Sequence, residues 1–275
     1  MLSDLWLDVR AVFKHHKRLK DIDYVTYTLF LVCCIFFVLS FALEMIYDSQ
    51  VNAQIVLGAY YRPFVIINYE YWRLFTAAFI HGGLLHLVCN MLALLSCGPM
   101  VEKMFGHKWY AIIVVGSIGM GSMFAHLTGA ELCVGLSGGL YGVLGAMVVL
   151  AWYHNWFQIP NIRNSFIRTA CLNLGISLLP GVSLMAHLGG LIFGVLCAMY
   201  SLQTIHKKRS SVSLNSGIAL VILCVVLIVQ VIRDPRLDRV YIQTDIEVIE
   251  IYQDLHIPMD KKIEQLEEYY QDFFK

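Results

Sequence analysis

Long apolar stretches alternate with short polar segments along most of the chain. Seven of these stretches reach or approach the roughly 20 residues that a helix needs to cross a bilayer core of about 30 Å. We expect transmembrane helices at about residues 25–46, 81–99, 109–129, 134–153, 165–180, 184–203 and 214–232. The fifth stretch is short and contains Arg168 and Asn173, and the second is interrupted by His81, His86 and Asn90.

The composition also indicates an integral membrane protein. Hydrophobic residues make up 58% of the 275 residues and charged residues only 15%, which is too apolar for an ordinary soluble domain. Only five acidic residues lie between Tyr24 and Ile232, whereas eleven lie after Ile232. We therefore predict an all-α polytopic membrane protein with an acidic polar tail.

The distribution of lysine and arginine predicts the orientation of the chain in the membrane. Twelve basic residues lie in the N-terminal segment and in the loops on its side, against Arg62 and Arg73 in the loops on the opposite side. Basic residues favour the cytoplasmic side. We therefore expect a cytoplasmic N-terminus and, after seven spans, an extracytoplasmic tail. The first span is too long for the apolar core of a secretory signal, and we interpret it as a retained anchor.

These patterns divide the chain into four parts. They are a basic cytoplasmic N-terminus (1–23), a membrane domain (24–204), a linker with a seventh transmembrane helix (205–232) and an acidic tail (233–275). In the tail, Ile263, Leu266, Tyr270 and Phe273 recur at helical spacing after Pro258, which predicts one short amphipathic helix. This helix would dock on the protein's own outer surface or on a partner.

A serine and a histidine lie at matching depth in two apolar spans. Ser137 is part of GLSGGLY (135–141), and His187 is part of MAHLGGL (185–191). Both spans run from outside to inside, so both side chains lie near the outer face. Glycines in both spans allow close helix approach, so that hydroxyl and imidazole could act as nucleophile and base. The alternative is a glycine-rich packing seam with interhelical hydrogen bonds.

A third polar cluster, HGGLLHLVCN (81–90), lies at the outer end of the second span. His86 and Asn90 are four residues apart and share one helix face, and we expect His81 in a loop or at the helix start. Neutral His86, Asn90 and the backbone N–H of Ser137 could donate hydrogen bonds to the oxyanion formed in amide hydrolysis. The alternative is a polar network that joins helix to loop.

Other catalytic chemistries have no matching pattern. No Asp or Glu occurs between Ala151 and Ile232, which favours a Ser–His dyad over a Ser–His–Asp triad. The chain has no HExxH sequence, and its eight cysteines lack zinc-ligand spacing. We expect no metal and no cofactor.

Four motifs together resemble the rhomboid family of intramembrane serine proteases. They are YWR (71–73), HGGLLHLVCN (81–90), GLSGGLYGVLGAM (135–147) and AHLGGLIFG (186–194). The resemblance covers roughly residues 60–200 and implies a rhomboid-like six-helix bundle, here with an additional seventh transmembrane helix. It implies Ser137 as nucleophile, His187 as general base, and His86 and Asn90 as oxyanion donors. The reaction would be hydrolysis of peptide bonds in or near transmembrane helices, close to the outer membrane face.

The resemblance also assigns supporting roles. Tyr141 would pack against the histidine, and Glu102 would stabilise the first outer loop. The residues that would support the active site are Gly135, Gly138, Tyr141 and His81, and those with structural roles are Trp72, Arg73, Glu102, Gly190 and Gly194. One departure is an extra residue between Gly181 and Ala186, which affects no catalytic position.

Two alternatives to a protease stay open. They are a non-catalytic rhomboid-like chaperone that binds membrane helices, and a transporter or channel in which the histidine–asparagine cluster lines a polar path. The expected partners are the lipid bilayer and membrane proteins with a destabilised transmembrane helix, and no nucleic acid is expected. The expected location is a bacterial plasma membrane, while the substrate and the oligomeric state stay open.

Overall fold

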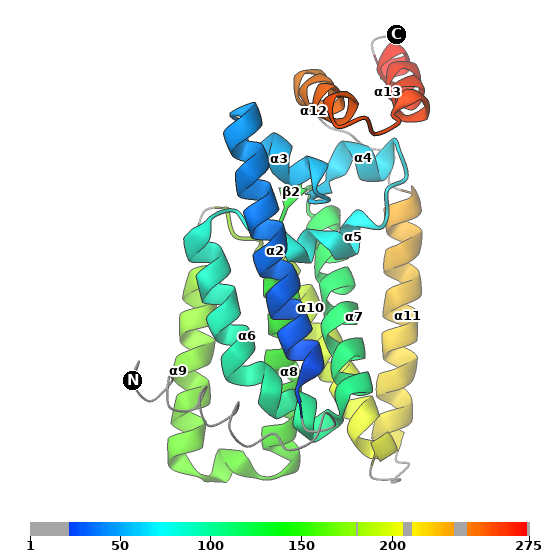
Figure 1. Cartoon of the computed structure of the whole chain (residues 1–275). Helices are drawn as coiled ribbons and strands as arrows, with labels where there is room; N and C mark the ends of the chain where they lie inside the picture. The colour runs from blue at the N-terminus through cyan, green and yellow to red at the C-terminus, as the bar shows by residue number, and fades with distance from the viewer. Residues whose placement is uncertain (1–21, 180, 206–210, 234–240, 274–275) are drawn as a thin grey trace.

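Seven long helices form a single bundle in the computed structural model, which describes residues 22–179, 181–205, 211–233 and 241–273 (Figure 1). The helices are α2 (Tyr24–Tyr47), α6 (Leu84–Phe105), α7 (His107–Leu127), α8 (Ser137–Tyr153), α9 (Pro160–Ser177), α10 (Leu184–Ile205) and α11 (Ser211–Arg233). Each overlaps one of the stretches expected from hydropathy, and the all-α polytopic membrane fold is confirmed.

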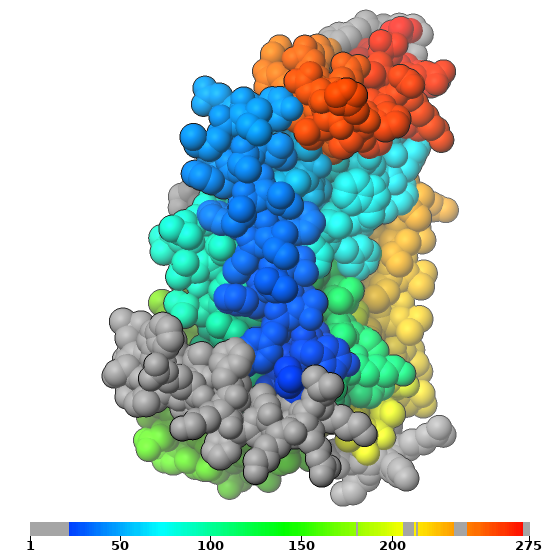
Figure 2. Space-filling model, in the orientation of Figure 1, coloured from blue at the N-terminus to red at the C-terminus, as the bar shows by residue number. Residues whose placement is uncertain are grey.

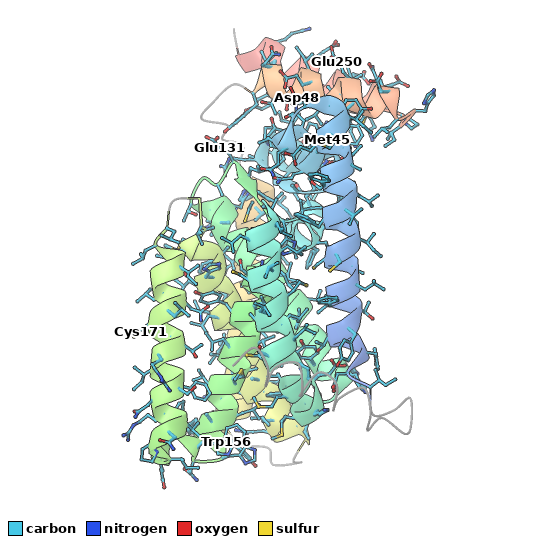
Figure 3. All side chains as sticks on the ribbon, turned by 60° about the vertical axis from the view of Figure 1, so that its left-hand side comes forward. Met45, Asp48, Glu131, Trp156, Cys171 and Glu250 are labelled. Atoms are coloured by element: carbon cyan, nitrogen blue, oxygen red, sulfur yellow. The ribbon has the colours of Figure 1, made fainter. Side chains whose placement is uncertain are left out.

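The bundle helices differ in how well they suit a bilayer. By length and composition, α2, α6, α7, α10 and α11 can cross a membrane, and α8 is a shorter apolar helix of 17 residues. Helix α9 is more polar, with Arg163 and Arg168, and does not reach the same hydropathy. It lies on one side of the bundle, where Cys171 is exposed on its outer surface (Figure 3).

Glycines bring α8 and α10 into direct backbone contact at the centre of the bundle. A Cβ added at Gly190 would overlap the backbone of Gly138, and one added at Gly194 would overlap the backbone of Gly142. Small residues at these positions let the two helices approach more closely than larger side chains would allow. This close packing holds the starts of α8 and α10 at the same end of the bundle.

The segment between α2 and α6 (residues 48–83), here called the outer loop after the membrane side that the sequence predicts for it, is folded into short elements. They are α3 (Gln50–Val56), β1 (Tyr60–Tyr61), α4 (Arg62–Ile66), α5 (Arg73–Thr76) and η2 (Ala77–Phe79). Strand β1 pairs antiparallel with β2 (Leu132–Cys133), which lies just before α8. The remaining short element, η3 (Trp156–Gln158), connects α8 to α9 at the opposite end of the bundle.

The tail forms two helices, α12 (Ile242–Asp254) and α13 (Asp260–Phe273), where only the second was expected. Both lie over the outer loop (Figure 2). Val248, Tyr252 and Leu266 of the tail pack in one apolar cluster with Tyr61 and Phe64 of the outer loop. Of the two expected docking surfaces, the protein's own outer surface is therefore the one observed.

The expectation for Glu102 is wrong in its location. Glu102 is fully buried near the end of α6 and accepts hydrogen bonds from the backbone N–H groups of Val25 and Thr26 at 3.0 and 2.9 Å. The carboxylate also accepts a hydrogen bond from the Thr26 hydroxyl at 2.7 Å and contacts His107 Nδ1 at 2.6 Å. At 1.5 Å per residue, Glu102 lies about 27 Å along α6 from the outer loop. It instead stabilises the start of α2, where a helix N-terminus favours negative charge.

Candidate active site

Ser137 and His187 meet at the end of the bundle that carries the outer loop. Ser137 is the first residue of α8, and His187 lies in the first turn of α10. The Nε2 atom of His187 is 2.9 Å from the Oγ atom of Ser137, which is hydrogen-bonding distance. The imidazole is buried and the serine is half-buried. The two residues that the sequence singled out from different spans are thus brought together.

Tyr141, one helical turn after Ser137, fixes the plane of the imidazole. Its ring stacks on His187 with centroids 4.1 Å apart and an interplanar angle of 9°. The tyrosine hydroxyl donates a hydrogen bond to the carbonyl oxygen of Asn173 in α9, at 2.8 Å. The stacking contact expected for Tyr141 is therefore present, and the hydroxyl extends it to a third helix.

Ser177, which the sequence reasoning did not identify, contacts the other ring nitrogen. Its Oγ atom, at the last residue of α9, is 2.7 Å from His187 Nδ1. The same hydroxyl is 2.8 Å from the carbonyl oxygen of Asn173 and 2.6 Å from the Tyr141 hydroxyl. The sequence analysis weighed only Asp and Glu as a third residue beside Ser137 and His187. The available signal was a hydroxyl residue at the end of the span that precedes the histidine.

His86 and Asn90 lie beside the loop that leads into Ser137. A Cβ added at Gly135 would be 2.6 Å from the His86 ring and 3.5 Å from the Asn90 side-chain nitrogen. Gly135 also has a φ of +113°, a conformation that side chains rarely adopt. Its N–H donates to the Ala77 carbonyl at 2.9 Å, which ties the loop before Ser137 to the outer loop. Glycine is thus required at this position for two independent reasons.

His86 and Asn90 carry side-chain N–H groups that differ in their hydrogen bonding. Asn90 Nδ2 is buried and has no hydrogen-bond partner among the residues that the structure describes. His86 Nδ1 accepts a long hydrogen bond from the Gly82 N–H, at 3.4 Å, so a neutral ring carries its proton on Nε2. Both N–H groups then lie beside Gly135, two residues before the serine.

His81 is buried in the loop before α6, as expected, and its ring lies edge-on to His86 with centroids 5.1 Å apart. Burial and the neighbouring His86 lower the pKa of His81 to about 4, so that it is neutral at physiological pH. It supports His86 by packing and has no direct contact with Ser137 or His187.

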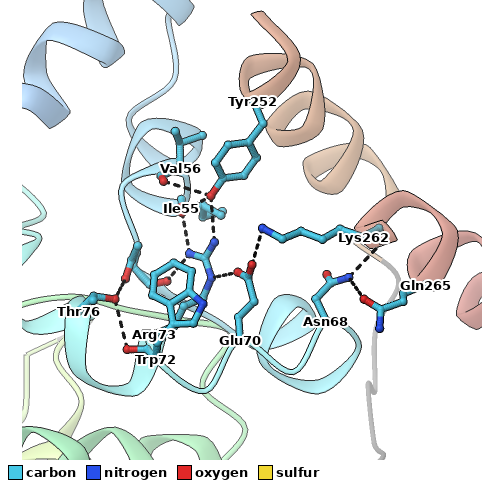
Figure 4. A network of polar contacts seen from close by, with 12 residues as sticks. Ile55, Val56, Asn68, Glu70, Trp72, Arg73, Thr76, Tyr252, Lys262 and Gln265 are labelled. Carbon is cyan, nitrogen blue, oxygen red and sulfur yellow. Dashed lines mark hydrogen bonds and ion pairs between the residues drawn. The ribbon is translucent and has the colours of Figure 1, made fainter. Parts of the chain in front are cut away.

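Arg73 lies at the centre of a buried polar network beneath the tail (Figure 4). Its side chain is fully buried. Its Nε donates to Glu70, its Nη1 to the carbonyl oxygens of Ile55 and Ala59 at 2.6 and 2.9 Å, and its Nη2 to the Tyr252 hydroxyl at 3.0 Å. The guanidinium thus holds three parts of the outer loop and one tail helix together.

The neighbours of Arg73 complete this network. Trp72 stacks on the guanidinium at 4.6 Å and leaves 46% of its surface exposed. Glu70 also pairs with Lys262 of α13. The structural role expected for Trp72 and Arg73 agrees with these contacts, but the participation of the tail was not foreseen.

Among the described residues, no group of three or more His, Cys, Asp or Glu side chains is placed to hold a metal ion.

The sequence matches a family model described as the Rhomboid domain over residues 68–204. This segment includes Ser137, His187, Ser177 and the His86–Asn90 pair, while α2, α11 and the tail lie outside it. Similar proteins include RHOMBOID-like protein 1 of Arabidopsis thaliana, which is 35% identical over 144 residues, 51% of this chain and 37% of that protein. The Rhomboid protease GluP of Bacillus subtilis (strain 168) is 32% identical over 135 residues, 49% of this chain and 27% of that protein.

Rhomboid-like protease 3 of Toxoplasma gondii is 29% identical over 171 residues, 60% of this chain and 65% of that protein. The chain thus spans less than half the length of the Arabidopsis and Bacillus relatives. The similarity lies in the membrane bundle that carries the site.

Proposed function

Because this chain belongs to the rhomboid family, we propose that it is an intramembrane serine protease in which Ser137 and His187 form the catalytic dyad. The observation that carries the proposal is the 2.9 Å contact between His187 Nε2 and Ser137 Oγ. It is supported by the Asn90 side-chain donor, which has no hydrogen-bond partner among the described residues and lies beside Gly135 in the loop before Ser137. A nucleophile, its base and free donors within one site are the parts that acyl transfer requires.

The proposed reaction proceeds through an acyl-enzyme. Ser137 Oγ attacks the carbonyl carbon of the peptide bond while His187 Nε2 takes the hydroxyl proton. The resulting oxyanion accepts hydrogen bonds from Asn90 Nδ2, His86 Nε2–H and the Ser137 backbone N–H. His187 then gives its proton to the leaving amine. In the second half, His187 removes a proton from water as the water oxygen attacks the ester carbonyl. His187 then returns that proton to Ser137 Oγ as the ester C–O bond breaks, which releases the carboxylic acid product and regenerates Ser137.

The membrane orientation is also part of the proposal. We infer from the basic residues that the N-terminal side is cytoplasmic and that the tail and outer loop face the other side. The described acidic residues Asp48, Glu131 and Glu250 lie at the tail end of the bundle, the side inferred to be extracytoplasmic (Figure 3). The relatives come from plants, a bacterium and a protozoan parasite, so a bacterial plasma membrane stays a prediction.

We expect the purified protein, reconstituted with a tagged single-span substrate, to cut that substrate in the outer part of its transmembrane helix. A helix hides its carbonyl groups in hydrogen bonds and must unwind locally before attack, so small residues at the bond and Gly or Pro nearby should favour cleavage. Mass spectrometry of the products locates the cut. Cuts clustered at the cytoplasmic end would contradict the proposed orientation.

The same preparation separates the protease from the two alternative functions. A fluorophosphonate probe should label the protein covalently at Ser137, because the probe needs an activated serine. A chaperone that binds helices, or a transporter, would bind or move its cargo without reacting with the probe. Absence of both labelling and cleavage would contradict the proposed function.

Replacing Asn90 or His86 by alanine should slow turnover without removing it. Loss of one fully engaged oxyanion donor typically lowers kcat by about 10²–10³-fold, and several donors share the charge here. We expect KM to change little, because the oxyanion forms only in the transition state. Asn161→Ala, at an exposed position of α9, serves as the matched control. Wild-type rates in both single variants and in the double variant would leave the cluster with a structural role only.

A further inference from the structure

The imidazole of His187 has a polar partner on each of its two nitrogens. On one side lies Ser137, and on the other Ser177 Oγ is 2.7 Å from Nδ1. No acidic residue occurs between Ala151 and Ile232, so neither α9 nor α10 supplies a carboxylate at this nitrogen. The group that faces Nδ1 is a neutral hydroxyl.

The surroundings of Ser177 determine which way its proton points. The Asn173 carbonyl oxygen lies 2.8 Å from Ser177 Oγ, and serines within helices commonly donate to the carbonyl four residues earlier. A carbonyl only accepts, and the Tyr141 hydroxyl, which donates to the same carbonyl, can itself accept from Ser177 at 2.6 Å. Either contact draws the Ser177 proton away from His187. The lone pairs of Ser177 then face Nδ1. They can accept a hydrogen bond only if His187 carries its proton there.

We propose that Ser177 is a positioning residue that holds the single proton of neutral His187 on Nδ1. This leaves the Nε2 lone pair free to accept the Ser137 proton, as a general base requires. When Nε2 is protonated, both nitrogens are donors, and Ser177 stabilises the cation by continuing to accept from Nδ1. The inference rests on the proposed function, since it concerns the same dyad. Ser177 performs the task of the aspartate in a Ser–His–Asp triad with a hydroxyl group.

The packing of α9 indicates that this contact is specific. Ser177 is buried, whereas the other residues of α9 are partly or fully exposed. The Tyr141 hydroxyl, whose ring stacks on His187, also contacts Ser177 at 2.6 Å. One hydroxyl cluster thus joins α9 to the dyad, and its members constrain both the plane and the protonated nitrogen of the ring.

The test compares Ser177→Ala with Ser177→Thr and with Ser165→Ala, a serine at an exposed position of the same helix. We expect Ser177→Ala to lower kcat and the fluorophosphonate labelling rate by about 10–100-fold, the range for a hydrogen bond to a group that becomes charged, with little change in KM. Ser177→Thr retains the hydroxyl and should recover most of the rate. Ser165→Ala should behave as the wild type.

¹⁵N NMR of histidine-labelled protein shows which ring nitrogen of His187 carries the proton. The His187→Gln variant identifies the signals that belong to His187. We expect a protonated Nδ1 in the wild type and a shift toward protonated Nε2 in Ser177→Ala. Wild-type kcat in Ser177→Ala, or a protonated Nε2 in the wild type, would overturn the inference. The inference would also be overturned if the loss of activity in Ser177→Ala came entirely from a lower fraction of folded protein, with a normal rate of fluorophosphonate labelling per folded molecule.

The results expected for Ser177 can be distinguished from the result expected if the protein is not a protease. A wild-type protein that neither cleaves nor reacts with the probe would contradict the protease assignment. The NMR measurement needs no turnover and would still decide whether Ser177 sets the protonation of His187.

Discussion

Replacing Ser137 by alanine is expected to abolish cleavage of a reconstituted single-span substrate, with a loss in kcat of at least about 10³-fold. The alanine removes the Oγ atom that lies 2.9 Å from His187 Nε2 and that is the proposed nucleophile. The fold should be unaffected, because Ser137 is the first residue of α8 and its side chain has no other hydrogen bond among the described residues. Product formation over time, measured at equal amounts of folded protein, gives the result.

The dyad also predicts how losses combine. His187→Ala should reduce kcat by a similar factor, and the double variant should be no slower than either single variant, because nucleophile and base act as one unit. Ser96→Ala, at an exposed position of α6, controls for loss of a serine from a membrane helix. Undiminished turnover in Ser137→Ala would mean that a different group is the nucleophile.

Replacing Arg73 by alanine is expected to give the largest loss of stability, about 3–5 kcal/mol. The guanidinium is fully buried, and its removal takes one donor each from Glu70 and from the Ile55 and Ala59 carbonyl oxygens and leaves a buried cavity. Tyr252→Phe removes only one member of the network and should cost about 0.5–1.5 kcal/mol. The midpoint of unfolding in detergent measures both effects.

Two further measurements test whether the loss of stability in Arg73→Ala comes from the network around Arg73. Arg163→Ala, at an exposed position of α9, should change the free energy of unfolding by no more than about 0.5 kcal/mol. Hydrogen exchange should rise in α12 as well as in the outer loop when Arg73 is replaced, because Nη2 bonds Tyr252. An unchanged midpoint in Arg73→Ala would show that the buried network contributes nothing to stability.

The features that the sequence predicted are those that the bilayer imposes. An apolar core of about 30 Å requires long apolar helices, so hydropathy located the bundle without knowledge of its packing. Ser137 and His187 could be paired because helix direction alone placed them at the same depth. The glycines of α8 and α10 then indicated that these helices approach closely, and the backbone contacts at Gly190 and Gly194 agree with that expectation.

The features that were missed depend on contacts that periodicity does not report. Ser177 is a common residue in a polar helix, and only its distance to His187 distinguishes it. Glu102 was matched by motif, which gives a position in the sequence but not a position along α6. Helix α12 was missed because Asp245 interrupts its apolar face, although Asp245 is buried and accepts hydrogen bonds from Tyr61 and Tyr270 at 2.8 and 2.6 Å.

The tail also places a condition on the order in which the protein is completed during synthesis. Arg73 lies before α6, but its Tyr252 partner is 179 residues further along the chain, and Asn68 bonds Gln265 across 197 residues. The ribosome synthesises the outer loop before α6, and it synthesises Tyr252 and Gln265, which form hydrogen bonds with that loop, only after α11. While α6 to α11 are being inserted, Arg73 therefore lacks one acceptor and the apolar surface that the tail will cover is open. Helices α12 and α13 therefore complete the contacts of an outer loop that is synthesised before α6.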